Sequence, residues 1–586
     1  MWSLRREKLG RFPRCLVKAR CISTAQPLVP TLSNISKSPN VVLPKQVIGS
    51  PSSSHDPSTI YVNPICKQMD QRIIKCSSPE DVLTILATHR GVLFVHNLVT
   101  AISSLAQMSF KRVSFNTSKK NVSEELYVNV KHDELLSDPR YSLLIQDLVD
   151  QSHKLDLQSI DTILSSLQKL DHCHFKLFGA LLKRIYGTRL TQGKVSIALS
   201  IGQTLQWGGF GKADAFFNQL GEILSVTAPY LPSKDLLNAA ILFSKLPSIH
   251  PEVMGVLAST IKGSVGNLSN RELGIAAIAV SEYGESIKSA SSCTRSLAEA
   301  FINRESESRD LIRVAISLRR TNTLEPQLLR KAWAQTCSDL RNALQFREQM
   351  EPSLATISDI ASLLDSVAHF GLCEPADLRD VFLPYISDHI DLVTEESAIR
   401  ILFALSTAAE AVTAANGPYV SILLRKIASA TDSWERHKSK LLTVFFAKSM
   451  QFDFVDAELR QFVVQSCLSH WLMSRRGYSV PYPELSESLY EAVRDFADEE
   501  CLFNEWIPHS PFNADVVFPN EKVCVLVLSR FSDVGQPVGI DLVQVKLIER
   551  LGWTVIPIDR KRLIELPLHT AVQSITDSLK PFPNQV

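Results

Sequence analysis

The sequence contains no run of 18 or more apolar residues, so no membrane-spanning helix is expected. Its 11 cysteines among 586 residues are too sparse for a disulfide-stapled scaffold. No CxxC pair occurs, which argues against a zinc ribbon or a thioredoxin-like motif. The 22 glycines and 29 prolines exclude collagen-like and proline-rich architectures. With 45% hydrophobic and 21% charged residues, the composition is that of a globular protein.

Motifs of common catalytic sites are also missing. We find no G-x-S-x-G, no H-E-x-x-H and no kinase set of glycine-rich loop, H-R-D and D-F-G. In His172-Cys173-His174 the two imidazoles would point about 200° apart on a helix, so we expect a helix end or turn rather than a zinc site. Residues 208–212 (GGFGK) lack the phosphate-loop pattern and are expected to form a turn between two helices. The sequence predicts no catalytic residue, metal or cofactor.

The net charge of +1 conceals an asymmetry between the first 22 residues and the rest. Residues 1–22 contain one acid, Glu7, against seven bases, and therefore carry +6, which leaves −5 for the remaining chain. The bases are Arg5, Arg6, Lys8, Arg11, Arg14, Lys18 and Arg20. An arginine-rich, serine-rich, acid-poor start is typical of a mitochondrial transit peptide, and Arg20 stands where such presequences carry the arginine before cleavage. The alternative is a basic disordered tail.

Residues 23–78 are rich in proline and serine, and we predict an unstructured linker there. A slightly acidic body does not indicate general binding of nucleic acid. Any such binding must therefore use local basic patches. We expect import into the mitochondrial matrix and no insertion into the membrane.

Residues 79–497 show apolar residues at three- and four-residue spacing, broken by short polar turns, which predicts helices. A short sequence pattern recurs, which consists of two or three apolar residues, a small residue, a polar residue and a bulky residue at the end. Its end points lie at residues 170, 207, 246, 283 and 321, separated by 37, 39, 37 and 38 residues. The next steps, to residues 370 and 408, are 49 and 38 residues long.

A unit of about 37–38 residues has room for two antiparallel helices, which cannot bury both their faces alone. We therefore predict an α-solenoid of about eight two-helix repeats, so that the fold class is mainly α. The long step indicates a lengthened helix within residues 329–351, and residues 111–140 read as an inserted polar loop or hairpin. The alternative is one large helical domain with coincidental spacing.

The pattern changes near Cys501. Residues 513–518 and 522–528 read as a β-hairpin, 541–551 as a helix capped by Gly552, 553–558 as a strand and 568–579 as a last helix. This order predicts a small C-terminal α/β domain over residues 505–582.

That domain resembles the RAP domain, an RNA-binding domain abundant in apicomplexan proteins. The resemblance is carried by the Asp515 hairpin, the strand 523–528 and the sequence LIERLGWTVIPI at residues 547–558. Its position after a helical array resembles the FAST-kinase-like and heptatricopeptide RAP proteins of mitochondria. This resemblance implies work on organellar RNA: processing, stabilisation, translation or ribosome assembly.

RAP domains resemble the PD-(D/E)xK nuclease fold, whose metal is held by carboxylates on two neighbouring strands. Asp515 occupies the first position, which makes it a vestigial nuclease residue. The expected acid on the next strand is replaced by Leu526 or Leu528, and the glycine that usually follows is replaced by Ser529-Arg530. We therefore expect a domain that does not cleave RNA.

RNA is gripped through its phosphates by lysine and arginine, and through its bases by stacking. The candidate RNA-binding residues are Lys546, Arg550, Arg560, Lys561, Arg562, Arg319, Arg320, Arg475 and Arg476. For each cluster the alternative is an ordinary solvated helix face. The sequence thus predicts a non-catalytic mitochondrial protein that binds mRNA or rRNA, with mitoribosomal proteins as further partners. The alternatives are a structural subunit of the mitochondrial ribosome, or an RNA nuclease acting through the C-terminal domain.

Overall fold

The structure is a computed structural model of the 586-residue chain. It describes residues 64–116, 134–246, 250–284, 287–345, 355–408, 417–428, 483–494, 501–508, 512–565, 570, 572–573 and 575. The chain divides into two units, Met1–Tyr61 and Val62–Val586, and every described residue belongs to the second. The predicted transit peptide, residues 1–22, lies outside the described residues. Within the described part, no helix combines the length and the apolar character that a membrane span requires.

The described chain begins with helix α1 (Pro64–Lys75), followed by α2 (Pro79–His89) and α3 (Val95–Asn116). The prediction of a linker as far as residue 78 is wrong for α1. Cys66, Met69 and Ile73 recur at helical spacing and are buried, since α1 packs against α3. The predicted loop at 111–140 is also too long, because α3 continues to Asn116 and α5 (Pro139–Asp150) begins at Pro139.

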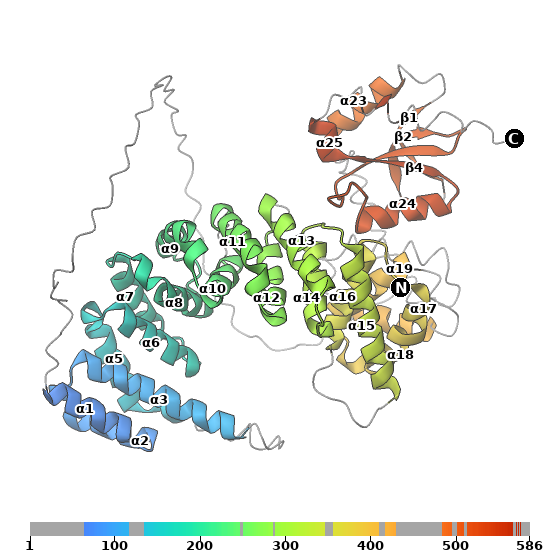
Figure 1. Cartoon of the computed structure of the whole chain (residues 1–586). Helices are drawn as coiled ribbons and strands as arrows, with labels where there is room; N and C mark the ends of the chain where they lie inside the picture. The colour runs from blue at the N-terminus through green and yellow to red at the C-terminus, as the bar shows by residue number, and fades with distance from the viewer. Residues whose placement is uncertain are drawn as a thin grey trace, which may run out of the picture. The chain divides into compact units, whose positions relative to one another are not determined.

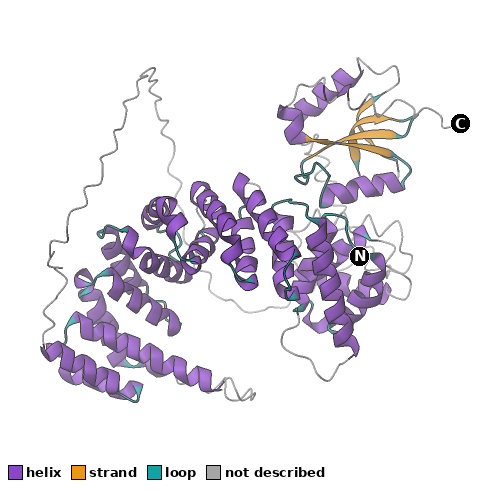
Figure 2. Ribbon diagram, viewed as in Figure 1, coloured by secondary structure: helices purple, strands orange, loops and turns teal. Residues whose placement is uncertain are grey.

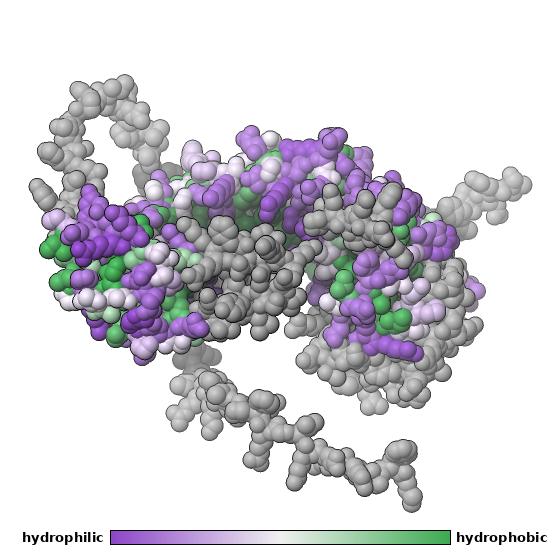
Figure 3. All heavy atoms as spheres, turned by 90° about the horizontal axis from the view of Figure 1, so that it is seen from below, coloured by the Kyte–Doolittle hydropathy of each residue, from purple (hydrophilic) through white to green (hydrophobic). Residues whose placement is uncertain are grey.

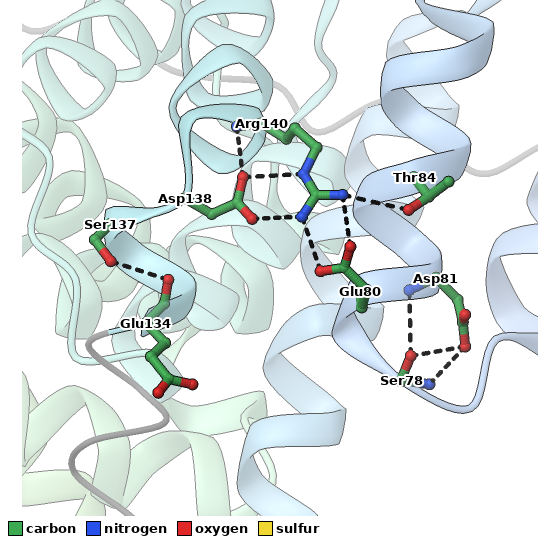
Figure 4. A network of polar contacts seen from close by, with 8 residues as sticks. All are labelled: Ser78, Glu80, Asp81, Thr84, Glu134, Ser137, Asp138 and Arg140. Atoms are coloured by element: carbon green, nitrogen blue, oxygen red, sulfur yellow. Dashed lines mark hydrogen bonds and ion pairs between the residues drawn. The ribbon is translucent and has the colours of Figure 1, made fainter.

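An arginine on α5 joins these first helices (Figure 4). The Arg140 guanidinium donates to both carboxylate oxygens of Glu80 on α2, each at 2.8 Å, and to both of Asp138, at 3.1 and 2.7 Å. Asp138 also accepts from the Arg140 backbone N–H at 2.7 Å and so caps α5. The start of α2 is fixed by a capping box between Ser78 and Asp81.

Seven helices then form one row, in which each helix packs against the next (Figure 1). They are α6 (Leu157–Lys169), α8 (Val195–Trp207), α10 (Ser233–Ser244), α12 (Asn270–Ser281), α14 (Ser308–Arg320), α16 (Ile357–His369) and α19 (Glu395–Thr407). Their first residues are separated by 38, 38, 37, 38, 49 and 38 positions. Helices therefore end where the sequence predicted, at or just before residues 170, 207, 321, 370 and 408.

A second row alternates with the first along the chain. It contains α7 (Phe175–Tyr186), α9 (Asp214–Thr227), α11 (Pro251–Ser264), α13 (Lys288–Ile302) and α15 (Pro326–Gln345). At 20 residues, α15 is longer than the 12 to 15 residues of the other four, which confirms a lengthened helix in the long step. After α16 the chain continues through α17 (Pro375–Asp377), a π-helical turn (Leu378–Phe382) and α18 (Leu383–Asp388), and α20 (Gly417–Ala428) follows α19. Short 3-10 helices join neighbouring helices at Arg90–Val92, Ser152–Lys154, Gln192–Lys194, Ala228–Tyr230, Val265–Asn267 and Ile390–Leu392.

The C-terminal domain contains all the described strands (Figure 2). They are β1 (Leu502–Trp506), β2 (Asn513–Phe518), β3 (Val523–Leu528) and β4 (Thr554–Asp559), which form one sheet in that order. The β1–β2 and β2–β3 pairs are antiparallel, whereas β3 and β4 are parallel and joined by α24 (Ile540–Arg550). The predicted hairpin, helix and last strand are confirmed.

Helices cover both faces of this sheet. Val545 and Ile548 of α24 pack with Cys524 and Leu526, whereas α23 (Pro483–Arg494) and α25 (Arg560–Glu565) pack with Val516, Phe518 and Val525. The boundary predicted at residue 505 is therefore too late, because β1 begins at Leu502 and α23, which precedes it, packs against the sheet. The predicted helix at 568–579 falls largely outside the described residues, and α25 starts directly after β4. The chain is thus mainly α with a small C-terminal α/β domain. Figure 3 shows one face of it, on which hydrophilic residues (purple) surround smaller hydrophobic areas (green).

Candidate nucleic-acid interface

Parallel strands β3 and β4 end side by side, with Leu528 paired to Asp559. The segments that follow them, the loop 529–539 and α25, therefore leave the same edge of the sheet. In open α/β sheets this carboxyl edge is the usual place for a ligand. It carries four basic residues, Arg530, Arg560, Lys561 and Arg562. Lys561 and Arg562 are exposed and the Arg530 side chain retains 49% of its accessible surface, so three of the four basic side chains on this basic edge are open to solvent.

Asp541 holds the start of the loop 529–539. Its carboxylate, at the beginning of α24, accepts the backbone N–H groups of Ser529 at 3.1 Å and Arg530 at 2.9 Å. Burial raises the pKa of this carboxyl group, and the Arg530 guanidinium, 3.9 Å away, opposes the shift. The Val538 N–H donates to the Arg530 carbonyl at 3.1 Å, so the two ends of the loop are tied together.

The loop 529–539 is joined through Asp533 to the helices, at the turn that ends α14. The Asp533 N–H donates to the Asn322 carbonyl at 3.1 Å, and its carboxylate accepts the Leu324 N–H at 3.0 Å. The same carboxylate forms an ion pair with Arg295 of α13. These three contacts fix the middle of the loop to two consecutive helices.

A second attachment lies at the end of α16. The Gly539 N–H donates to the His369 carbonyl at 2.7 Å, and the His369 Nε2 lies 2.8 Å from the Asn322 side-chain oxygen. Gly539 has φ of +62°, and a Cβ there would lie 2.9 Å from His369 Nδ1. A residue without a side chain is therefore required at this contact, both by the backbone angle and by the space.

Arg319 and Arg320, two of the predicted RNA-binding residues, form ion pairs within the protein. Arg319 on α14 binds Asp365 on α16 at 2.9 Å, and the Asp365 side chain retains only 2% of its accessible surface. Arg320 pairs with Glu282, which follows α12. Both arginines therefore connect successive helices of the first row.

The remaining predicted residues are distributed over different places. Lys546 of α24 is half-buried, and its Nζ lies 3.0 Å from the position that a Cβ would take at Gly371. Arg550 is exposed at the end of α24, on the opposite face of the sheet from α25. Arg475 and Arg476 lie outside the described residues. Of the nine predicted residues, the structure thus brings Arg560, Lys561 and Arg562 together at the carboxyl edge.

Asp515 is buried between the sheet and α23. One carboxylate oxygen accepts the Ser486 hydroxyl at 2.7 Å, and the other accepts the Val527 N–H at 2.7 Å. Burial raises the pKa of this carboxyl group, and the two hydrogen bonds oppose the shift. Both oxygens are therefore occupied by contacts within the domain.

The short histidine and glycine motifs are turns, as the sequence predicted. His174 caps α7, because its Nδ1 accepts the Leu177 N–H at 3.3 Å, and His172 hydrogen-bonds with the Tyr141 hydroxyl at 2.8 Å. Cys173 Sγ donates to the Gly208 carbonyl at 3.3 Å. Residues 208–212 connect α8 to α9, and Gly209 there has φ of +83°.

Two comparisons with known proteins bear on the identity of the chain. No family model matches the sequence, and no curated protein matches it. The resemblance to the RAP domain consequently rests on the Asp515 hairpin, the strand 523–528 and residues 547–558 alone.

Sequence reasoning missed the residues that attach the loop 529–539 to the helices. Asp533 and Arg295 are separated by 238 positions, and Gly539 and His369 by 539 − 369 = 170 positions. The sequence shows the two glycines of the loop, Gly535 and Gly539, but a glycine-containing loop does not indicate which helix it contacts. Arg530 carried a usable signal, since it is the second residue after a predicted strand.

Proposed function

We propose that this protein binds single-stranded RNA in mitochondria without cleaving it, acting in processing, stability, translation or ribosome assembly. The proposal rests first on the basic edge at the ends of β3 and β4, where Arg530, Lys561 and Arg562 are exposed and Arg560 is half-buried. Basic side chains at such an edge suit the phosphates of a nucleic acid. The α/β domain would act as a RAP-like clamp on one part of the RNA.

We further propose that the two rows of helices are an α-solenoid that follows the RNA. The regular spacing of helix starts supports this, as does the packing of each first-row helix on the next. A stack of this kind offers an extended surface in which each unit contacts its neighbours. Such an extended surface fits an extended single strand of RNA better than a folded RNA.

A binding role is favoured over the nuclease alternative by the surroundings of Asp515. A metal-binding carboxylate must offer free oxygen lone pairs to the ion, together with a second carboxylate nearby. Here both oxygens of Asp515 accept hydrogen bonds from Ser486 and Val527. Strand β3 carries only apolar side chains and a cysteine, so no acid stands beside Asp515 on it.

The test is a binding titration of the full chain with fluorescently labelled single-stranded RNA over a series of salt concentrations. We expect Lys561→Ala/Arg562→Ala to weaken binding, because these side chains are exposed at the basic edge. The slope of log affinity against log salt should fall by about 1.4, at about 0.7 per lost phosphate contact.

A matched control removes two exposed lysines from α1, in Lys67→Ala/Lys75→Ala, and should keep the wild-type slope. Equal weakening in both double variants would mean that net charge alone attracts the RNA. If the wild-type chain binds no RNA at any salt concentration, the function proposed here is wrong, and a structural role on the ribosome becomes the better hypothesis.

A further inference from the structure

Four aromatic rings form a cluster where the turns α6–α7 and α8–α9 meet. The rings of Phe178 and Phe210 are stacked, with centroids 5.3 Å apart and planes at 11°. The Phe175 ring lies 6.0 Å from Phe210, and the Trp207 ring lies 6.4 Å from Phe178. One continuous aromatic group therefore joins two successive helix pairs.

The inner rings of this cluster are held in place, while the outer ones face solvent. Phe178 is completely buried, whereas Phe175 retains 72% and Trp207 retains 37% of its accessible surface. Gly208 makes the arrangement possible, because a Cβ there would lie 2.6 Å from the Phe178 ring. The two exposed aromatic side chains thus pack on buried rings that fix their positions. Single exposed residues scattered over a surface lack such support.

Three exposed lysines, Lys169, Lys176 and Lys212, lie close to these rings along the chain, and a fourth, Lys245, lies at the end of α10, where its carbonyl accepts from Gln206 beside Trp207. None of them forms an ion pair with a described residue, although ten arginines between Arg90 and Arg400 do. The acids of the same turns are Asp171 and Asp214, so positive charge is in excess. These ammonium groups remain available to a ligand.

Hydrogen bonds join the ends of three first-row helices at this place. The Thr204 hydroxyl on α8 lies 3.4 Å from the Gln168 side-chain oxygen of α6. The Gln206 amide on α8 donates to the Lys245 carbonyl at the end of α10 at 3.0 Å. The aromatic faces and the lysines therefore share one edge that spans α6, α8 and α10.

We propose that this edge is a second RNA-binding site, in which Phe175 and Trp207 stack on bases and the lysines contact phosphates. The inference rests on the proposed function and adds where the bases are held. Stacked aromatics flanked by basic residues are the usual surface for single-stranded nucleic acid. A protein partner fits less well, because lysine is depleted in the cores of protein–protein interfaces.

The experiment compares variants of the full chain in binding a labelled, mixed-sequence single-stranded RNA of about 16 nucleotides. Phe175→Ala/Trp207→Ala should bind at least about 30-fold more weakly, while the salt slope stays unchanged because no phosphate contact is lost. Phe175→Tyr/Trp207→Tyr keeps both aromatic faces and should keep the affinity. Phe175→Ala alone should weaken binding too, and this side chain is too exposed to support the fold.

The control variant, Val226→Ala/Tyr230→Ala, removes exposed apolar side chains on another pair of elements, where Tyr230 retains 86% of its accessible surface. It should bind as the wild type does. Wild-type affinity in Phe175→Ala/Trp207→Ala would overturn the stacking site and leave the proposed function standing, whereas absence of binding by the wild type would refute both. The stacking site would also be overturned if Phe175→Ala/Trp207→Ala bound RNA normally but no longer bound a protein that the wild type binds in RNase-treated extracts.

Discussion

At the residue scale, Asp515 shows how a site that resembles a nuclease position can serve the fold. Its carboxylate closes a gap between β2, β3 and α23 by accepting from Ser486 and Val527. A buried carboxylate with two donors is costly to remove, because each donor left without a partner loses a hydrogen bond that water cannot replace.

We therefore expect Asp515→Ala to reduce the free energy of unfolding by about 1–3 kcal/mol. Asp515→Asn should be tolerated, since its amide can accept from Val527 and donate to the Ser486 hydroxyl. Urea unfolding of both variants measures this difference. An Asp515→Ala protein as stable as the wild type would contradict a structural role for the carboxylate.

The same carboxylate predicts a dependence on pH. Burial raises its folded-state pKa above the usual 3.8, so the folded chain binds the proton more tightly than the unfolded chain does. This contribution to stability is complete below 3.8 and is lost as the pH rises through the folded pKa. Relative to Asp515→Asn, the wild type should lose stability as the pH is raised from 3.8 through that folded pKa, and parallel stability curves would contradict the shift.

At the scale of elements, α14 and α16 are joined by two Arg–Asp pairs that differ in burial. Arg319 and Asp365 are 2.9 Å apart, with the carboxylate buried, whereas Arg309 and Asp359 are 3.6 Å apart and only partly buried. Arg319→Ala should cost about 3 kcal/mol, because it removes the guanidinium that pairs with a buried carboxylate. Arg309→Ala should cost less than about 1 kcal/mol. Thermal unfolding of the two variants tests this, and equal losses would show that burial does not distinguish the pairs.

A second prediction concerns the attachment of the loop 529–539 to α16. Gly539→Ala introduces a methyl group at φ of +62° and 2.9 Å from His369, so it should destabilise the chain by more than about 1 kcal/mol. Amide hydrogen exchange should rise at Leu324 and Gly539, whose N–H groups donate across this contact. Gly263→Ala is the control, because nothing lies within 4 Å of a Cβ there and alanine favours a helix. Unchanged exchange in Gly539→Ala would mean that the loop adapts.

The sequence anticipates elements whose signal is local. Strands β2, β3 and β4 were predicted because their apolar runs are bounded by turns. The helix ends near residues 207 and 321 were predicted because a short sequence pattern recurs there. Strand β1 was missed since Leu502–Trp506 is half-buried and includes Asn504 at φ of +51°, so no apolar alternation marks it. The contacts of Asp533 and the exposure of Phe175 depend on residues distant in the sequence, which one sequence cannot reveal.

At the scale of the whole molecule, the first-row helices contact mainly their neighbours, so a local defect should remain local. Leu164→Ala empties a fully buried position on α6 and should cost about 2–5 kcal/mol. Hydrogen exchange should then increase in α3, α6 and α8 but not in α16 and α19. Leu402→Ala on α19 should give the reverse profile. A uniform increase along the chain in either variant would show that the helices unfold as one unit.

The attachment of Asp533 to Arg295 and Asn322 also sets an order of events during synthesis. The helices up to α16 make contacts between segments close in sequence, so they can fold while the ribosome is still adding residues. The loop 529–539 is made more than 200 residues after Arg295 and finds its partners already in place. Its hydrogen bonds can form only on a correctly stacked α13, α14 and α16. Docking of the loop 529–539 therefore depends on the packing of helices made before it, and a nascent chain with a misplaced helix would be left with an undocked C-terminal domain.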